Sequence, residues 1–373
     1  MTLDPIVSPS PQAWGPTLRD RLDRIMSDGM EQGVFPGGVV LVRHRNDVVV
    51  HEAYGLSFSH QDASTRSSAQ HETRPETIYD LASITKVFTA TCMMRLVDEQ
   101  AFQLDDPVAK QLAEFAANGK GEITVRQLLA HVAGLPNLRL WEKAPTAEAR
   151  FWSVMAVPPG FSAGTALEYS DTNFIVLGRL IEAATGESLS QAIAARIVDP
   201  LGLSHTRYGP LAAPKANIAA TEDESYVERG MVWGEVHDEN AWCLGGTAGH
   251  AGLFGTARDL SIFGQMYLNG GTYDGVEVLK PATVAKMTRN QIGALGDRGL
   301  GWQVNAPHYM GGLASPQTYG HTGFTGTSIV IDPRRDLIVV LLTNRVHPTR
   351  HGPDVNLVRH AVAEAVRDAV DTI

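Results

Sequence analysis

Cysteine is scarce in this chain of 373 residues, which has only Cys92 and Cys243. Two thiols have neither the number nor the spacing of a disulfide framework or a zinc site. Cys92 lies in an apolar segment typical of a helix, and Cys243 lies in a Gly-rich stretch. We interpret both as packed thiols and expect no metal site.

Long hydrophobic runs are also missing. No stretch approaches the roughly 20 apolar residues of a membrane-spanning helix. The first basic residue is Arg19, so the N-terminus lacks the pattern of a signal peptide. The sequence therefore predicts a soluble, cytoplasmic protein, or a periplasmic or secreted one if a leader precedes the given chain.

Positive charge is in the minority. Lysine and arginine number 31 against 41 acidic residues, giving a net charge of −10, and the basic residues are scattered rather than gathered in a run. This distribution excludes nucleic acid as an expected partner. With 43% hydrophobic and 19% charged residues, the chain is an ordinary globular protein of one large domain or two.

Segments of helical and of strand-like spacing alternate along the chain. Helices are expected over residues 17–33, 83–100, 257–268 and 354–369, with Thr256 and Asp259 as a capping box for the third. Hairpins are expected to join residues 37–43 to 47–55 and residues 327–332 to 336–343.

The order of these elements indicates the α/β class, in its α+β form. Both termini contain sheet and helix, whereas the middle of the chain is mostly helical. We therefore predict one α/β domain formed by residues 1–80 and 245–373, with a mostly helical region, residues 81–244, inserted between its halves.

Ser83 and Lys86 form the one Ser-x-x-Lys sequence in the chain, at the start of an expected helix that follows the strand-like segment 78–81. Residues three apart lie on one side of a helix, so Lys86 can reach the Ser83 hydroxyl. A serine becomes nucleophilic when a neighbouring group takes its proton, and Ser-Lys pairs are a known solution. In isolation, an N-capping serine beside a solvated lysine explains the same residues.

Two further segments change this interpretation. The three motifs are Ser83-x-x-Lys86, Tyr169-Ser170-Asp171 and His321-Thr322-Gly323. Their order resembles that of class C β-lactamases, DD-peptidases and family VIII carboxylesterases, which form the serine β-lactamase-like superfamily. LDDPVAKQL, ITVRQLLAHVAGLP and GGTAGHAGLF add to the likeness. The resemblance implies a β-lactamase/DD-peptidase-like fold, in which an antiparallel sheet flanked by helices meets a mostly helical region at the active-site cleft.

The resemblance also implies roles for individual residues. Ser83 would attack a carbonyl, Lys86 would accept or orient its proton, and Tyr169 would pass a proton to the leaving group. The backbone N–H groups of Ser83 and Phe324 would form an oxyanion hole. The expected substrate contacts are Asp171, His321, Thr322 and Gly323. An acyl-enzyme on Ser83 needs neither a metal nor an organic cofactor.

The second and third motifs depart from the class C pattern, which has Tyr-x-Asn and Lys-Thr-Gly. Asp171 replaces an amide, and an ionised carboxylate cannot donate a hydrogen bond to a substrate carbonyl. His321 replaces a lysine, and histidine loses its charge near neutral pH. The sequence therefore predicts that activity on anionic substrates falls as the pH rises through roughly 6.5.

The segment Gly160-Phe161-Ser162-Ala163-Gly164 fits the Gly-x-Ser-x-Gly elbow of α/β-hydrolases. That elbow needs a strand before the serine and a helix after it. Here Val157-Pro158-Pro159 precedes the segment, so we interpret Ser162 as a loop residue.

Several histidines have no metal-binding spacing and are expected to hold loops by hydrogen bonds: His131, His237, His250 and His347. The segment 235–240, GEVHDEN with its preceding glycine, has two open interpretations, a part of the cleft rim or a solvated turn.

These observations favour a serine hydrolase acting on small ester or amide substrates, with a family VIII-like carboxylesterase as the first choice. A β-lactamase, a D-amino-acid peptidase or DD-peptidase, and a penicillin-binding-type sensor that acylates without turnover are the alternatives. The partner is a small molecule, an ester, β-lactam or peptide. The loops around Trp141, Phe161 and Tyr319 are expected to decide the substrate.

Overall fold

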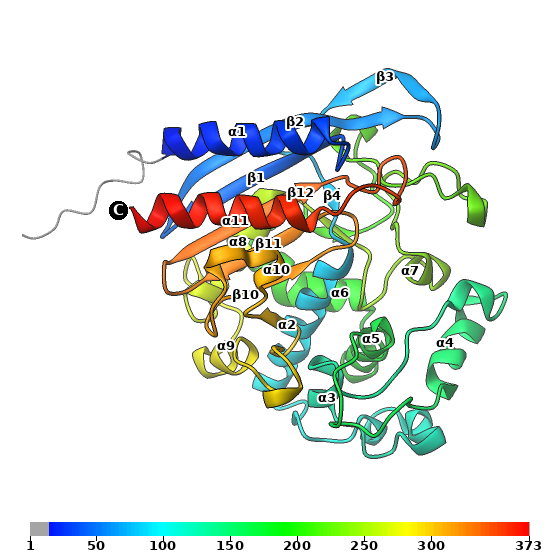
Figure 1. Cartoon of the computed structure of the whole chain (residues 1–373). Helices are drawn as coiled ribbons and strands as arrows, with labels where there is room; N and C mark the ends of the chain where they lie inside the picture. Colours follow the sequence, from blue (N-terminus) through cyan, green and yellow to red (C-terminus); the bar gives the residue numbers. More distant parts are fainter. Residues whose placement is uncertain (1–14, 373) are drawn as a thin grey trace, which may run out of the picture.

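The computed structural model describes residues 15–372 and is organised around a seven-stranded antiparallel sheet (Figure 1). The strand order is β3-β2-β1-β12-β11-β10-β9. The strands of this sheet are β1 (Gly37–His44), β2 (Asp47–His60), β3 (Arg66–Glu72), β9 (Gln303–Val304), β10 (Tyr319–Thr322), β11 (Ser328–Asp332) and β12 (Leu337–Thr343). Because β1 pairs with β12, both ends of the chain share one sheet.

Shorter strands lie outside the large sheet. A three-stranded sheet has the order β4-β6-β5, and β7 and β8 form a separate pair. Their bounds are β4 (Tyr79–Asp80), β5 (Arg207–Tyr208), β6 (Leu253–Gly255), β7 (Thr272–Tyr273) and β8 (Val276–Glu277).

The α-helices of the described residues differ widely in length. They are α1 (Gly15–Glu31), α2 (Thr85–Asp98), α3 (Val125–Leu129), α4 (Ala147–Ala156), α5 (Asp171–Thr185), α6 (Leu189–Ile193), α7 (Glu239–Cys243), α8 (Ala257–Leu268), α9 (Pro281–Met287), α10 (Pro307–Met310) and α11 (Asn356–Asp371). A short 3-10 turn, η1 (Ala82–Ile84), precedes α2.

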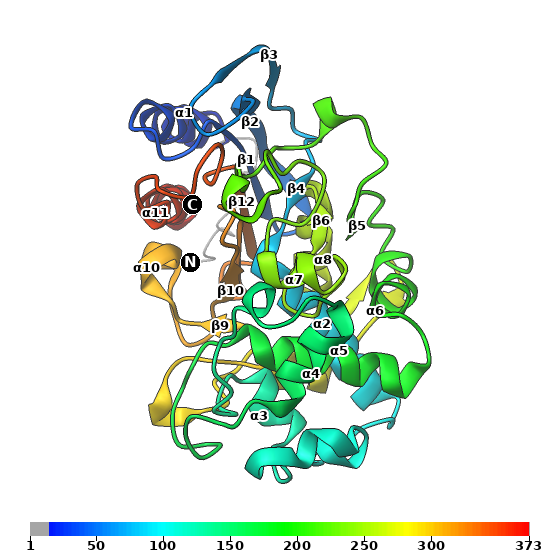
Figure 2. The same ribbon diagram turned by 90° about the vertical axis from the view of Figure 1, so that its right-hand side faces the viewer.

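Helices cover both faces of the large sheet, with α1, α10 and α11 on one side and α8 on the other (Figure 2). Successive side chains of a strand point to opposite faces. Val40 and Val42 therefore pack in the cluster beneath α1 and α11, whereas Val39 and Leu41 pack in the larger cluster that contains α8. This two-sided burial explains why β1 is apolar at consecutive positions.

The helical part of the chain packs around α2, which contacts α5 and α6 (Figure 1). Most residues of α2 are buried, including polar ones such as Thr89 and Lys86. Such burial on nearly all sides places α2 in the interior of the helical part. The large cluster continues from α2 into α3, α5 and the sheet, so the site at the start of α2 stands on a rigid support.

The expected elements are largely confirmed. Both hairpins form, and the helix expected over residues 257–268 has those bounds. Of the expected capping box only the N-cap half forms: Thr256 Oγ1 accepts a hydrogen bond from the N–H of Asp259 at 3.2 Å, whereas the Asp259 carboxylate accepts from the N–H of His205 at 2.9 Å. The helix expected from residue 83 begins instead with η1. Both thiols are free and buried, as expected. The division at residues 80 and 245 stays a prediction.

The Pro- and Ser-containing N-terminal tail, on which the expectation of no signal peptide depends, falls mostly outside the described residues. Within residues 15–372, no helix combines the length and the hydrophobicity needed to cross a membrane.

Candidate active site

A cleft of 510 Å³ is lined by residues from both parts of the chain. Ser83, Tyr169 and Asp171 line it from the helical part, and Gln303, His321 and Thr322 line it from the sheet and its flanking segment. The three motifs of the sequence therefore meet in one cavity, although they are separated by long stretches of chain.

Ser83 lies in the turn η1, between β4 and α2. Ala82, just before it, has a φ of 46°, a left-handed conformation that is unfavourable for alanine. The carboxylate of Asp80 accepts a hydrogen bond from the N–H of Ala82 at 2.8 Å, and Thr325 Oγ1 donates to the Asp80 carbonyl at 2.7 Å. These contacts hold the strained turn that carries Ser83 at the cleft.

Lys86 is fully buried, and its ammonium group contacts three acceptors. Nζ lies 2.9 Å from Ser83 Oγ, 2.7 Å from Asp171 Oδ1 and 3.2 Å from the carbonyl oxygen of His250. Burial lowers the pKa of Lys86, but the charge of Asp171 and the neighbouring Tyr169 outweigh it and raise that pKa above its ordinary value. Lys86 therefore keeps its proton at neutral pH and donates a hydrogen bond to Ser83 Oγ.

Asp171, expected to contact substrate, also forms an ion pair with Lys86. It lines the cleft, but its Oδ1 forms the ion pair with Lys86, and its side chain is 27% exposed. Asp171 is also the first residue of α5, where the helix dipole favours a negative charge. The replacement of an amide by a carboxylate thus fixes the charge of Lys86.

The Tyr169 ring is surrounded by polar groups. Lys86 Nζ lies 4.9 Å from its centroid, Arg298 Cζ lies 5.2 Å from it, and the His131 ring lies 4.6 Å away. His131 Nδ1 accepts a hydrogen bond from the N–H of Ser170 at 3.1 Å, which confirms that this histidine holds the motif's loop.

His321 lies on β10 and lines the cleft, but the structure differs from the titration expected of it. The side chain is buried, and its Nδ1 faces the carbonyl oxygen of Thr322 at 2.8 Å. Burial, followed by the charges of Lys86 and Arg298, lowers the pKa of His321 well below its ordinary value. His321 is therefore neutral near pH 6.5, because burial and the two cations beside it make a third positive charge unfavourable there.

Gly323 brings the end of β10 close to the turn that carries Ser83. Its N–H donates to the Thr327 carbonyl at 2.7 Å. A Cβ at this position would lie 2.1 Å from Thr327 Oγ1 and 2.6 Å from the Leu81 carbonyl oxygen. Only glycine fits there, and the backbone of Phe324 follows directly. The backbone of Gly323 thus lies against the turn that carries Ser83, a contact in addition to the one expected with substrate.

Arg298 is a cleft residue that the sequence reasoning missed. Its Nη1 is buried and has no hydrogen-bond partner among the described residues. Burial lowers the pKa of Arg298, and the groups that oppose this effect are Tyr169 and Tyr309, neither of which is a carboxylate. Three further arginines line the cleft, namely Arg345, Arg350 and Arg359. No sequence motif distinguishes these arginines from the other basic residues.

The segment 235–240 belongs to the cleft, which decides between its two interpretations. His237, Asp238, Glu239 and Asn240 all line the cavity. Asp238 Oδ1 lies 2.8 Å from His250 Nε2, so this histidine also holds a loop, as expected.

The substrate-defining loops are only partly as expected. Trp141 lines the cleft, whereas Tyr319 is 2% exposed in the core. Phe161 and Ser162 line a separate depression. Ser162 lies in an irregular segment without a preceding strand, which agrees with its interpretation as a loop residue.

The model of the β-lactamase family matches residues 22–364 of the chain. This chain belongs to the β-lactamase family. A relative from Salmonella enteritidis PT4, provisionally named D-alanyl-D-alanine carboxypeptidase, is 34% identical over 94% of this chain and 88% of its own. A relative of the same name from Escherichia coli O157:H7 is 33% identical over 94% of this chain and 87% of its own.

Solved structures show the same fold. A penicillin-binding protein homologue from Caulobacter crescentus has a TM-score of 0.72 at 21% identity and covers 96% of this chain and 98% of its own. A family VIII carboxylesterase has a TM-score of 0.71 at 22% identity and covers 99% of this chain and 100% of its own. This member of the β-lactamase family is thus a serine hydrolase of the superfamily that contains β-lactamases and penicillin-binding proteins.

Proposed function

We propose that Ser83 is the nucleophile, that Lys86 is its permanent cationic partner, and that Tyr169 transfers protons. Lys86 already carries its proton and donates to Ser83 Oγ, so it stabilises the charge that develops on this oxygen. Tyr169 takes the Ser83 proton as it gives its own to the leaving-group atom, which leaves the tyrosine neutral before and after the step.

The product of this step is an acyl-enzyme. The bond between the carbonyl carbon and the leaving group breaks, the bond to Ser83 Oγ forms, and the leaving group departs with the proton from Tyr169. Hydrolysis runs this step in reverse with water as the nucleophile: water bonds to the carbonyl carbon and gives a proton to Tyr169, Tyr169 returns its own proton to Ser83 Oγ, and the bond from Oγ to the carbonyl carbon breaks to release the acid. The N–H groups of Ser83 and Phe324 are proposed to bind the oxyanion, supported by the contact of Gly323 with the Ser83 turn.

The preferred substrate is proposed to be a peptide with a free carboxylate at its end, so that the enzyme acts as a carboxypeptidase. The observation that carries this proposal is the buried Arg298 Nη1 beside Tyr169, which has no hydrogen-bond partner within residues 15–372. A buried guanidinium without a counter-charge is unfavourable, and a carboxylate on the leaving group would satisfy it with two parallel hydrogen bonds. The names of the relatives from Salmonella and Escherichia agree with this chemistry.

Hydrolysis of a neutral carboxylic ester, which the sequence favoured, is the second candidate. The likeness in fold to a family VIII carboxylesterase agrees with it, and the absence of an amide at Asp171 disfavours the acylamide substrates of a β-lactamase. A neutral leaving group would bring no counter-charge to Arg298. A sensor that acylates once differs from both in having a burst without turnover.

The test compares a blocked D-alanyl-D-alanine peptide with its methyl ester, p-nitrophenyl butyrate and nitrocefin, including the burst phase. Hydrogen bonds to a charged group contribute about 1.5–3 kcal/mol. Arg298→Gln should therefore raise KM for the free-carboxylate peptide by about 10- to 100-fold and leave p-nitrophenyl butyrate hydrolysis unchanged. Ser83→Ala should abolish all turnover, and Ser162→Ala is the matched control that should remain active.

Other outcomes separate the candidates. Faster turnover of neutral esters, together with an unaltered KM in Arg298→Gln, would establish the esterase instead. Rapid nitrocefin hydrolysis would establish the β-lactamase, and a burst without turnover the sensor. Full activity in Ser83→Ala would refute the assignment of the nucleophile.

A further inference from the structure

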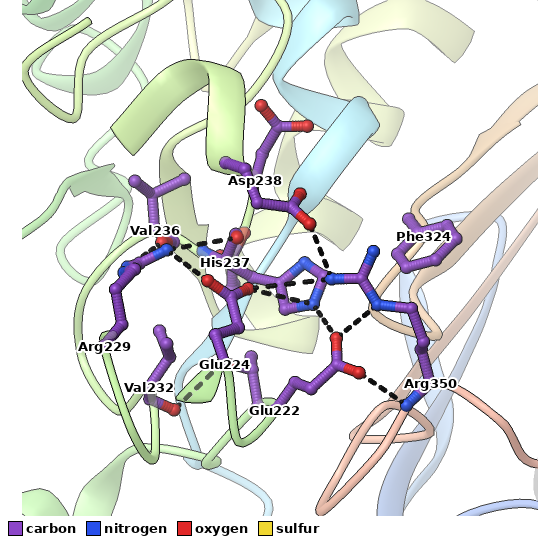
Figure 3. A network of polar contacts seen from close by, with 12 residues as sticks. Glu222, Glu224, Arg229, Val232, Val236, His237, Asp238, Phe324 and Arg350 are labelled. Atoms are coloured by element: carbon purple, nitrogen blue, oxygen red, sulfur yellow. Dashed lines mark hydrogen bonds and ion pairs between the residues drawn. The ribbon is translucent and has the colours of Figure 1, made fainter. Parts of the chain in front are cut away.

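A buried network of charged side chains borders the cleft and contains His237 (Figure 3). His237 Nε2 lies 2.9 Å from Glu222 Oε2 and 3.5 Å from Glu224 Oε1. Arg350 Nε lies 2.6 Å from Glu222 Oε2, and Arg229 Nη1 lies 2.6 Å from Glu224 Oε2. The side chains of Glu222, Glu224 and His237 are all nearly inaccessible to solvent. None of the three motifs includes these residues.

With all its carboxylates ionised, this network has one negative charge in excess, and a proton on His237 or on Glu224, whose pKa burial raises to about 7, would balance it. Glu222, Glu224 and the adjoining Glu239 carry three negative charges, and Arg229 and Arg350 carry two positive ones. A net charge in a buried site is costly. Burial lowers the pKa of His237, but the hydrogen bond to Glu222 and the charges of both glutamates outweigh it and raise that pKa.

Glu222, Glu224 and His237 are also metal-ligand types, with one ligand atom of each within 4.8 Å of the others. Arg350 and Arg229 already occupy oxygens of both glutamates. A divalent cation would have to bind beside these two positive charges. The charge balance therefore favours a proton, on His237 or on Glu224, over a metal ion.

The backbone of His237 is tied to the nucleophile's turn. Its N–H donates to Asp80 Oδ2 at 2.7 Å, while Asp80 Oδ1 accepts from the N–H of Ala82 at 2.8 Å. One buried carboxylate thus holds both His237 and the residue before Ser83.

The imidazole of His237 contacts the other side of the site, at Phe324. The two rings are stacked, with centroids 5.6 Å apart and an interplanar angle of 26°. The Phe324 side chain is 48% exposed, and its other close partners are Arg345, with Cζ 4.6 Å from the ring centroid, and Arg350, with Cζ 5.4 Å from it. Removing the imidazole would leave this exposed ring without its aromatic partner.

We propose that His237 is a positioning residue that keeps the N–H groups of Ser83 and Phe324 directed at one point in the cleft. Its backbone is anchored to the Ser83 turn through Asp80, and its imidazole, fixed by Glu222, holds the Phe324 ring. This inference rests on the proposed function, because it takes these two N–H groups to be the oxyanion hole. Oxyanion donors act only when they are held in place before the reaction.

The test is a double-mutant cycle of His237→Gln and Phe324→Ala. Glutamine keeps a hydrogen-bond donor for Glu222 but lacks the ring. Alanine at 324 keeps the backbone N–H but removes the side chain, and because Phe324 is largely exposed, this variant should fold. Arg335→Ala, which breaks an ion pair with the buried Asp332, is the control for a loss of stability alone.

Loss of a whole oxyanion donor lowers kcat by about 100- to 1000-fold, so misplacement should lower it by about 10- to 100-fold. The readouts are kcat and KM for the blocked D-alanyl-D-alanine peptide and the affinity for phenylboronic acid. The adduct of this acid with Ser83 places an oxygen in the oxyanion hole. Each single variant should lower kcat and boronate affinity by the same factor, with little change in KM. The double variant should have a kcat and a boronate affinity no lower than those of the less active single variant, because both substitutions remove the same ring contact.

Unchanged kcat and boronate affinity in His237→Gln, or losses that multiply in the double variant, would overturn the proposal. The proposal would also be overturned if kcat in His237→Gln fell only in proportion to the melting temperature, as in the control Arg335→Ala. A failure of the proposed function is distinguishable, because it would appear as turnover in Ser83→Ala. Supplementation with zinc should change nothing, and activation by zinc that is lost in Glu224→Gln would favour a metal site instead.

Discussion

Replacing Asp171 by asparagine restores the amide that class C β-lactamases have at this position and removes the counter-charge of Lys86. The ion pair has an Nζ–Oδ1 distance of 2.7 Å, with Lys86 fully buried and Asp171 27% exposed. Asparagine is nearly isosteric and can still accept a hydrogen bond from Lys86. The substitution therefore isolates the effect of charge on the site.

The size of the effect follows from two limits. With an effective dielectric constant of about 20, two unit charges 2.7 Å apart attract by about 6 kcal/mol. The loss of stability cannot reach this value, because Lys86 can lose its proton instead. Deprotonating a lysine with an unfolded pKa of about 10.4 costs about 4.6 kcal/mol at pH 7 and about 1.9 kcal/mol at pH 9.

We expect Asp171→Asn to lower the free energy of unfolding by about 3 kcal/mol at pH 7, since the retained hydrogen bond offsets part of the limit. The loss should shrink to below about 2 kcal/mol at pH 9, where neutral Lys86 becomes accessible. In the native protein the raised pKa of Lys86 stabilises the fold below the unfolded lysine value, and this stabilisation is unchanged between pH 7 and 9.

Urea denaturation of both proteins at pH 7, 8 and 9 measures these differences. A loss below about 1 kcal/mol at pH 7, or a loss at pH 9 above the limit of about 1.9 kcal/mol, would refute the reasoning. The first result would mean that the pair is screened by solvent, and the second that asparagine disturbs packing.

Three further predictions concern the cleft and the buried charged network beside it. Gly323→Ala, whose Cβ would lie 2.1 Å from Thr327 Oγ1 and 2.6 Å from the Leu81 carbonyl oxygen, should lower stability by about 1–3 kcal/mol and reduce kcat, so native values of both would contradict the clash. Burial raises the pKa of Glu224 to about 7, so native stability should fall as the pH rises from about 4.5 to 7. Glu224→Gln should flatten the fall of the melting temperature between pH 4.5 and 7. An unaltered pH dependence in this variant would contradict the raised pKa of Glu224. Because the pKa of His321 is lowered, KM for a free-carboxylate peptide should show no His321 titration between pH 6 and 8, whereas a rise near pH 6.5 that disappears in His321→Ala would restore the interpretation made from the sequence.

Local features of the site were predictable because they depend on neighbours within a few residues. The spacing of Ser83 and Lys86 follows from one helical turn, and the Nζ–Oγ distance of 2.9 Å agrees with it. The capping of α8 by Thr256 and the two hairpins follow from equally local patterns. The resemblance of the three motifs to a family then placed Tyr169 and His321 in the same cleft.

Other features required the tertiary structure. The sequence suggested that His321 would titrate near neutral pH, but its state depends on burial between Lys86 and Arg298. Arg298 itself has no motif, and only the path of the chain between α9 and β9 brings it to Tyr169. The segment with His237 could equally have been a solvated turn, because its partners Glu222 and Arg350 are distant in sequence from one another.

The sequence by itself determined the periodicity of the helices and strands, the reach of Lys86 to Ser83 and the order of the three motifs. These depend on backbone geometry and on residue type. The tertiary structure alone decided the charge of Lys86, the neutrality of His321, the exposure of Arg298 to the cleft and the buried network around His237. Each of these is set by burial and by charges from distant segments, because electrostatic free energies depend on distance and solvation in space and not on separation along the chain.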